Sequence, residues 1–282
     1  MKPVFPYPGG KSRLLKEILP FIPQEGVRTC VEPFAGGLAV LLAHVRPFPN
    51  EVVNDLSGGM MAFYRMAVAH PEALIAELAC RIASRADFEA ELRLPTCATE
   101  LGRAARWFWL TKHSFGAQGA HFGRGKDIFH GVDILSDGDA IRRLSVRLKK
   151  AVFRNCDACD VVREFDAPDT FFFLDPPYVA CAETAYDAFS ENDMARLRDT
   201  LKACKGMWLL TCDDSLATRR VFAGFHARGT EIKYSLAKDK SGKISKELVV
   251  FSENLAEKFP GQTSLLFAPT EQNIRSSKIR LA

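Results

Sequence analysis

The tetrapeptide Asp175-Pro176-Pro177-Tyr178 carries the side chains of this chain that are best suited to chemistry. It directly follows residues 170–174, an apolar run that predicts a strand buried on both faces. Ligands of open α/β sheets bind where strands end, so the tetrapeptide lies at a position suited to a binding site. The prolines have a fixed φ and no N–H, which makes the turn stiff and leaves carbonyls without a local donor.

The motif therefore offers two acceptors, a carboxylate and a bare carbonyl, beside the flat ring of Tyr178. This arrangement suits a planar group that carries an NH2, such as the amino edge of adenine. The lone pair of such an amine is delocalised into the ring, so the nitrogen is a poor nucleophile. Acceptors that bond its hydrogens free the lone pair and stabilise the positive charge that grows during alkylation. We interpret all four residues as catalytic; an ordinary aspartate in a rigid turn is the alternative.

A glycine turn precedes a second predicted ligand position. Residues 28–32 predict a strand, and Pro33-Phe34-Ala35-Gly36-Gly37 separates it from an apolar helical start at 38–43. Such a turn lets a ligand approach the backbone closely, although the G-x-G-x-x-G spacing is absent. The next predicted strand, 51–55, ends at Asp55, about 20 residues further on, where nucleotide-binding folds place a carboxylate on ribose hydroxyls. Asp55 as a cap of the following helix is the alternative.

A third motif, Tyr7-Pro8-Gly9-Gly10-Lys11-Ser12, contains the Gly-Lys-Ser of a phosphate loop. A Walker A loop needs another glycine five residues before Gly10, and that position is Phe5. The sequence therefore disfavours an ATPase.

In chain order, the N-terminal motif, the glycine turn from Glu32 to Gly37, Asp55 and the tetrapeptide resemble the Dam-type adenine-specific DNA methyltransferases, over residues 5–252. The resemblance implies a Rossmann-like enzyme that uses S-adenosylmethionine and methylates adenine N6 in double-stranded DNA, with the target base flipped out. The order of cofactor motif, recognition insert and catalytic motif resembles the alpha group of amino-methyltransferases. Leu38 departs from the small polar residue that many relatives carry after the glycines.

The resemblance also implies residue roles. The segment 32–36 would hold the methionine end of the cofactor and Asp55 the ribose, while Asp175, Pro176 and Tyr178 would take the target adenine. The implied cofactor-binding residues are Tyr7, Gly10, Lys11, Glu32, Phe34, Gly36, Asp55, Asn155, Cys156 and Asp175.

Between the motifs, residues 57–150 predict a mostly helical DNA-recognition insert, because 60–69, 71–82 and 101–110 have apolar residues at helical spacing. Within it, the segment 112–126 mixes glycines, aromatic residues and hydrogen-bond donors, and it resembles the family segment that precedes a recognition hairpin. A flexible surface loop is the alternative there. A lysine-rich turn at 238–243 resembles a backbone-contacting hairpin tip or is a plain charged turn. The predicted DNA-binding residues are Lys112, Gln118, Arg124, Lys126, Lys240 and Lys243.

The predicted organisation is an α/β, Rossmann-like S-adenosylmethionine-dependent methyltransferase sheet with a helical insert. The catalytic domain would be discontinuous, with residues 1–56 and 151–252, followed by a polar tail at 253–282. Strands are expected at 151–153, 170–174, 207–211, 231–236 and 248–251.

Composition agrees with this organisation. The 282 residues are 47% hydrophobic with a net charge of +4, which fits a globular protein and permits polyanion binding. The eight cysteines include one C-x-x-C pair, Cys156 and Cys159, without a second pair, so we expect no metal site. We expect a cytoplasmic protein that does not bind a membrane, and its oligomeric state stays open. Methylation of another planar amine, in RNA or glutamine, and a non-catalytic DNA-binding repressor are the alternatives.

Overall fold

The computed structural model describes residues 1–44, 46–123, 131–178, 189–234 and 243–267. The chain forms two compact units. The first comprises Met1–Leu19 and Arg28–Val161, and the second comprises Pro20–Val27 and Val162–Ala282.

Parallel strands form the sheet portion of the first unit, in the order β3-β2-β1. Their bounds are β1 (Thr29–Glu32), β2 (Asn50–Asn54) and β3 (Val152–Arg154). The register places Val31 opposite Val52, and Val52 opposite Val152. Because these strands run in the same direction, their carboxyl ends meet at one edge, which is where open α/β sheets bind ligands.

Short helices also belong to the first unit: η1 (Lys11–Arg13), α1 (Leu15–Ile18) and α2 (Ala39–Ala43). The short helix η2 (Leu19–Phe21) begins at the last residue of the segment Met1–Leu19, and its other two residues belong to the second unit. Helix α2 begins after Leu38, which has a left-handed backbone with φ 53° and ψ 35°. A non-glycine residue in this region is strained, and such strain persists only where the surrounding structure fixes it.

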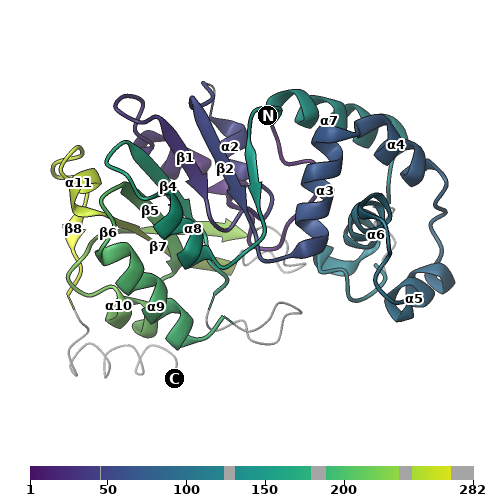
Figure 1. Ribbon diagram of the computed structural model, residues 1–282. Coiled ribbons are helices and arrows are strands. Elements are labelled where there is room, and N and C mark those ends of the chain that lie inside the picture. The colour runs from purple at the N-terminus through teal and green to yellow at the C-terminus, as the bar shows by residue number, and fades with distance from the viewer. Residues whose placement is uncertain (45, 124–130, 179–188, 235–242, 268–282) are drawn as a thin grey trace, which may run out of the picture. The chain divides into compact units, whose positions relative to one another are not determined.

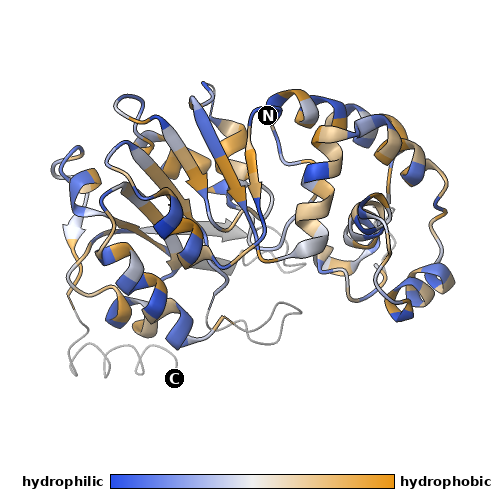
Figure 2. Ribbon diagram, viewed as in Figure 1, coloured by the Kyte–Doolittle hydropathy of each residue, from blue (hydrophilic) through white to orange (hydrophobic). Residues whose placement is uncertain are grey.

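A helical cluster makes up the rest of the first unit: α3 (Gly58–Ala69), α4 (Pro71–Ala79), α5 (Arg85–Arg93), α6 (Glu100–His113), η3 (Phe115–Ala117) and α7 (Ile134–Arg147). Helix α3 packs against α6 and α7, and α4 packs against the same two helices (Figure 1). Figure 2 shows that α3 is mainly hydrophobic whereas α5 is largely hydrophilic. The rings of Phe63 and Phe108 stack with centroids 4.8 Å apart in the core of this cluster.

Hydroxyl side chains begin three of these helices. Ser57, Ser84 and Thr99 each accept a hydrogen bond from the backbone amide three residues on. Each cap satisfies one of the amide groups that a helix start leaves without a partner.

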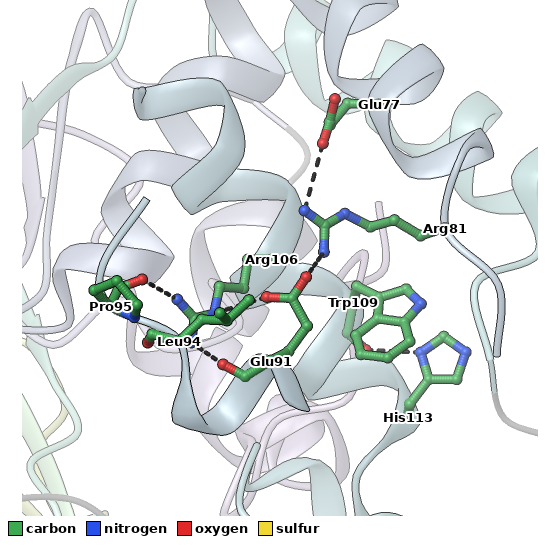
Figure 3. A network of polar contacts seen from close by, with 8 residues as sticks. All are labelled: Glu77, Arg81, Glu91, Leu94, Pro95, Arg106, Trp109 and His113. Atoms are coloured by element: carbon green, nitrogen blue, oxygen red, sulfur yellow. Dashed lines mark hydrogen bonds and ion pairs between the residues drawn. The ribbon is translucent and has the colours of Figure 1, made fainter. Parts of the chain in front are cut away.

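An ion-pair network joins α4, α5 and α6 (Figure 3). Glu91 accepts from Arg81 at 2.9 Å and lies 3.2 Å from Nε of Arg106. Arg106 also donates to the carbonyls of Leu94, at 3.0 Å, and Pro95, at 2.8 Å. The three charged side chains are mostly removed from solvent, so the network fixes the α5 segment against α6.

The second unit contains the strand order β4-β5-β7-β6-β8. The bounds are β4 (Thr170–Leu174), β5 (Met207–Asp213), β6 (His226–Tyr234), β7 (Lys243–Phe251) and β8 (Ser264–Leu265). Strands β4 and β5 are parallel, and β5–β7, β7–β6 and β6–β8 are antiparallel. Every residue of β4 is buried, as its apolar run predicts.

The remaining helices are α8 (Ala158–Phe165), α9 (Glu191–Lys202), α10 (Leu216–Val221) and α11 (Glu253–Ala256). A capping box of Ser190 and Asp193 starts α9. Among the described residues, no helix has the length and apolar character that crossing a membrane requires.

These elements confirm the predicted α/β, Rossmann-like class. The predicted strand at 170–174 has the observed bounds, whereas β6 and β7 begin earlier than predicted, at His226 and Lys243. The segment predicted as a polar tail contains α11 and β8, and β8 pairs with β6. The proposed boundaries between catalytic domain and recognition insert stay a prediction.

Candidate active site

Gly36 is held from three sides in the first unit. Its N–H donates to Oδ2 of Asp55 at 3.0 Å, and its carbonyl accepts from the buried hydroxyl of Tyr64 at 2.6 Å. Its φ is +44°, and a Cβ built on it would lie 2.7 Å from Cε1 of Tyr7. The ring of Tyr7 therefore covers the place where any other side chain would stand, which explains why glycine is required.

Asp55 connects the glycine turn to the end of β2. Its Oδ1 accepts from the amide of Ser57 at 2.9 Å, while its Oδ2 accepts from Gly36. Burial raises the pKa of Asp55, and the two amides partly oppose that shift. The cap of α3 is Ser57, whose hydroxyl accepts from Met60, so the helix-cap alternative for Asp55 is wrong.

Tyr64 is a functional candidate that the sequence did not single out. It is buried, and burial together with the charges of Asp55 and Glu32 raises the pKa of its hydroxyl well above the ordinary value. The neutral hydroxyl is thus kept as a donor to Gly36. Its only sequence signal was its place on the apolar face of a predicted helix.

Asn54 joins the ends of all three strands in this unit. Its Nδ2 donates to the carbonyl of Pro33 at 2.9 Å and to that of Cys156 at 3.0 Å, and its Oδ1 accepts from the amide of Cys156 at 3.0 Å. The residue is fully buried. A buried amide is costly unless its groups are paired, so these bonds fix the relative positions of the strand ends. Asn54 is not among the residues predicted for the site, although a polar residue at the end of a buried strand is a usable signal.

The predicted Asn155 and Cys156 lie beside this amide. The Nδ2 of Asn155 donates to the carbonyls of Asp55, at 2.7 Å, and Leu56, at 3.1 Å. The structure therefore brings both residues to the turn that carries Asp55.

Glu32 ends β1 and is 1% exposed. Its Oε1 accepts from the amide of Leu41 at 2.7 Å, in the first turn of α2. The half-buried Phe34 and the strained Leu38 lie in the intervening turn. The carboxylate thus helps to fix the turn whose backbone was predicted to hold the methionine end of the cofactor.

The N-terminal motif forms a tight turn. The amide of Gly10 donates to the carbonyl of Tyr7 at 3.0 Å, and Nζ of Lys11 donates to the carbonyl of Gly9 at 3.0 Å. Lys11 is 4% exposed, so its ammonium is largely removed from water. Through Tyr7, this turn packs directly on Gly36. The predicted residues Tyr7, Gly36 and Asp55 are therefore neighbours.

The second unit carries the tetrapeptide Asp175-Pro176-Pro177-Tyr178, directly after β4. Asp175 is half-buried, and its Oδ1 accepts from the hydroxyl of Thr211 at 2.8 Å. The hydroxyl of Tyr178 donates to the carboxylate of Glu247, with its two oxygens 2.5 and 2.6 Å away. Neither Thr211 nor Glu247 was predicted from the sequence.

This geometry leaves acceptor capacity at the end of β2. A carboxylate can accept about four hydrogen bonds, and Asp55 accepts one backbone amide on each of its oxygens. The remaining sites can accept from hydroxyl or amino groups of a ligand. No cluster of histidine, cysteine or acidic residues that could hold a metal ion occurs among the described residues.

The predicted DNA-binding residues are only partly described. Arg124, Lys126 and Lys240 lie outside the described residues, and Lys243 is the first residue of β7. Nζ of Lys112 donates to Asp137 on α7 at 2.8 Å, and the lysine side chain is 17% exposed. Lys112 therefore joins α6 to α7, whatever else it contacts.

Gln118 lies in a tightly closed loop. The amide of Phe115 donates to His121 and that of Gly123 to His113, both at 2.8 Å, around an isolated bridge between Ser114 and Phe122. Within the loop, Gly116, Ala117 and Gly119 have positive φ. Phe115, beside the bridge that closes this loop, is 63% exposed, and it is not among the predicted DNA-binding residues.

Known proteins match the same regions. Residues 7–90, which hold the N-terminal motif, the glycine turn and Asp55, match the family model of the D12 class N6 adenine-specific DNA methyltransferase. The type II methyltransferase M.CviBI of Paramecium bursaria Chlorella virus NC1A is 26% identical over 258 residues, 88% of this chain and 96% of that protein.

A second relative and one solved structure extend the comparison. The type II methyltransferase M.MjaIII of Methanocaldococcus jannaschii is 25% identical over 232 residues, covering 70% of this chain and 78% of that protein. The structure of the putative methyltransferase yhhF from Escherichia coli has a TM-score of 0.35 and 12% identity, over 84% of each chain. The family model over residues 7–90 and the two sequence relatives, with the strand-end motifs described above, confirm the predicted resemblance to the N6 adenine-specific DNA methyltransferases.

Proposed function

We propose that the two units divide the work of adenine-N6 methylation. The carboxyl ends of β1, β2 and β3 would bind S-adenosylmethionine, and the residues after β4 would bind the target adenine. The observation that carries the proposal is the glycine turn fixed by Asp55, Tyr64 and Tyr7, because a close backbone approach at strand ends suits a nucleoside cofactor.

The donor and acceptor groups of the first unit fit this cofactor. Asp55 accepts hydrogen bonds from the amides of Gly36 and Ser57, and its remaining acceptor sites suit ribose hydroxyls. The turn between Glu32 and α2 offers backbone groups to the methionine end. When bound, S-adenosylmethionine supplies an electrophilic methyl group on a sulfonium.

The tetrapeptide would prepare the amine. Asp175 and a carbonyl of the proline pair would accept the two hydrogens of the adenine amino group, and Tyr178 would stack on the base. Both acceptors stabilise the positive charge that develops on nitrogen, and the alkylated ammonium is acidic enough to lose its proton afterwards. The hydrogen bond from Thr211 holds one carboxylate oxygen in a fixed direction.

The substrate would be duplex DNA from which the target adenine is flipped out, because the amino group of a stacked and paired base cannot reach a buried methyl donor. The loop at 113–123 would contact DNA through Gln118 and the exposed ring of Phe115, since apolar side chains can act as wedges between bases.

Asp175→Ala tests whether the residues after β4 act on the adenine and leave cofactor binding to the first unit. Losing a charge-assisted contact to the reacting amine should cost about 3 kcal/mol or more in the barrier, while affinity for S-adenosylmethionine should be largely spared. The methylated sequence is first identified by sequencing DNA from expressing cells. Turnover is then measured by transfer of labelled methyl to that duplex, and cofactor affinity by calorimetry.

The matched control is Asp199→Ala, which removes a surface aspartate of α9 that pairs with Arg198. Near-normal turnover of Asp175→Ala would show that the carboxylate does not serve the amine. Transfer to single-stranded DNA, RNA or a glutamine peptide in preference to the duplex would contradict the proposed substrate form.

A further inference from the structure

The hydroxyl of Tyr178 has a charged partner that comes from a distant strand. It donates to Glu247, with the two carboxylate oxygens at 2.5 and 2.6 Å. The two residues are 69 positions apart in the sequence, and Glu247 lies within β7. A hydrogen bond to a carboxylate is roughly twice as strong as one between neutral groups. The contact therefore fixes the position of the hydroxyl end of the Tyr178 ring and the direction of its long axis.

Glu247 lies in an unusual place for a carboxylate. Its exposed fraction is 0%, and its strand β7 runs between β5 and β6. In register it stands opposite Asp213 on β5 and Thr230 on β6. Acidic residues directly opposite each other on neighbouring strands are destabilising, and burying a carboxylate is costly unless donors reach it. An apolar residue would serve a purely structural role at lower cost.

A second bond attaches the other end of the tetrapeptide to the same face of the sheet. Thr211 and Asp213 lie two residues apart on β5, so their side chains point to one face. Glu247 stands directly opposite Asp213 and shares that face. Thr211 holds Asp175, and Glu247 holds Tyr178. The rigid proline pair between them is thus anchored at both ends by neighbouring strands.

We infer that Glu247 is a positioning residue for the target adenine, and that it acts by fixing the ring of Tyr178 in the orientation that receives the flipped base. This inference rests on the proposed role of Tyr178 as the stacking surface. A ring held by its para hydroxyl cannot tilt or withdraw, so the enzyme would not spend binding energy on ordering it when the base arrives.

The experiment is a double-mutant cycle of Glu247→Met and Tyr178→Phe in the full-length protein. Methionine approximates the shape of glutamate without its acceptors, and phenylalanine keeps the ring without its donor. Each single variant should lower kcat/KM for the cognate duplex by roughly 10- to 100-fold, since a hydrogen bond to a charged group is lost. The double variant should be no worse than either single variant, because both changes remove the same contact. Glu247→Gln, which keeps an acceptor, should recover part of the loss.

Two readouts separate positioning from general stability. The fluorescence of 2-aminopurine at the target position reports unstacking of the base, and it should fall in Glu247→Met at saturating DNA. Cofactor affinity should be unchanged. The matched control is Ser252→Ala, directly after β7 and far along the strand from Glu247. The substitution removes the buried hydrogen bond that Oγ of Ser252 accepts from the amide of Trp208 at 3.0 Å. It should lower thermal stability without changing the fluorescence.

Tyr178→Ala distinguishes a failure of the positioning role of Glu247 from a failure of the stacking role of Tyr178. The positioning role is overturned, and the stacking role stands, if Tyr178→Ala impairs turnover and flipping but Glu247→Met does not. The same holds if the effect of Glu247→Met adds fully to that of Tyr178→Phe. If Tyr178→Ala leaves turnover and flipping intact, the stacking role fails and the inference fails with it.

Discussion

Replacing Gly36 with alanine should weaken S-adenosylmethionine binding far more than the same change at Gly37. Gly36 has a φ of +44°, in the region that L-residues avoid, at a cost of about 1–2 kcal/mol. The added Cβ would also lie 2.7 Å from Cε1 of Tyr7, and overpacking of this kind costs about 1–3 kcal/mol. Together these effects oppose the present turn by about 2–5 kcal/mol.

The turn cannot shift without losing other bonds, because the same residue donates to Asp55 and accepts from Tyr64. If the cofactor binds only the present conformation, affinity should fall by roughly 30-fold or more, at 1.4 kcal/mol for each factor of ten. Calorimetry gives the dissociation constant, and urea unfolding shows whether the variant is folded. DNA affinity should change little, since the substitution lies in the proposed cofactor turn.

Gly37→Ala is the control within the same turn. Its Cβ would lie 3.4 Å from Cβ of Tyr7 and 3.5 Å from Cβ of Pro3, close to ordinary contact distances, and Gly37 is not among the residues with positive φ. Tyr7→Leu in the Gly36→Ala background should return part of the affinity by relieving the clash. If folded Gly36→Ala binds the cofactor within about twofold of Gly37→Ala, the turn is not the cofactor site.

Further predictions concern other groups in the first unit. Asp55→Ala should weaken cofactor binding by about 1.5–3 kcal/mol and should also lower thermal stability, because Gly36 loses its acceptor; unchanged affinity in a folded variant would retire the ribose assignment. Burial lowers the pKa of His113, so the folded state is most stable, with respect to this group, above the unfolded pKa of about 6.5, and stability is lost as the pH falls below that value toward the lower folded pKa. His113→Asn keeps a donor for the Trp109 carbonyl and should reduce the loss of unfolding free energy between about pH 7.5 and 5.5; an unchanged loss would contradict this. Gln118→Ala should change the preference between cognate and altered sites by roughly 1–3 kcal/mol, measured on single-base-pair variants at fixed salt, whereas a uniform loss of affinity would indicate a phosphate contact.

The strands were predictable where their environment was simple. The run 170–174 is buried along its whole length, and its apolar composition alone gave the observed bounds of β4. Strand β6 begins at His226, and its first residues include Arg228 and Gly229, which carry no strand signal. Pairing with β7 imposes the extended conformation there, because strand formation depends on the partner more than on intrinsic preference.

The candidate site was predictable as motifs but not as contacts. The glycine turn, Asp55 and the tetrapeptide stood out because turn residues and acids at strand ends have few other uses. Their partners did not, since Tyr64 is 28 residues from Gly36, and Cys156 is 102 residues from Asn54. A single buried polar residue on an otherwise apolar element has no periodic pattern, so only the fold shows what it contacts.

Lys112 shows the same limit for charged residues. Its type and its place in a glycine-rich, basic segment favoured a DNA contact, yet its ammonium donates to Asp137, which is 5% exposed. A sequence gives the sign of a charge but not its neighbours, and a lysine that neutralises a buried carboxylate contributes less positive field to a passing polyanion. Asp137 also accepts from the amide of Asp133, at the start of α7, so the pair fixes that helix start beside α6. The effect of Lys112 on DNA would then be exerted through the placement of these helices, and Lys112→Met should weaken DNA binding only as far as it disturbs them.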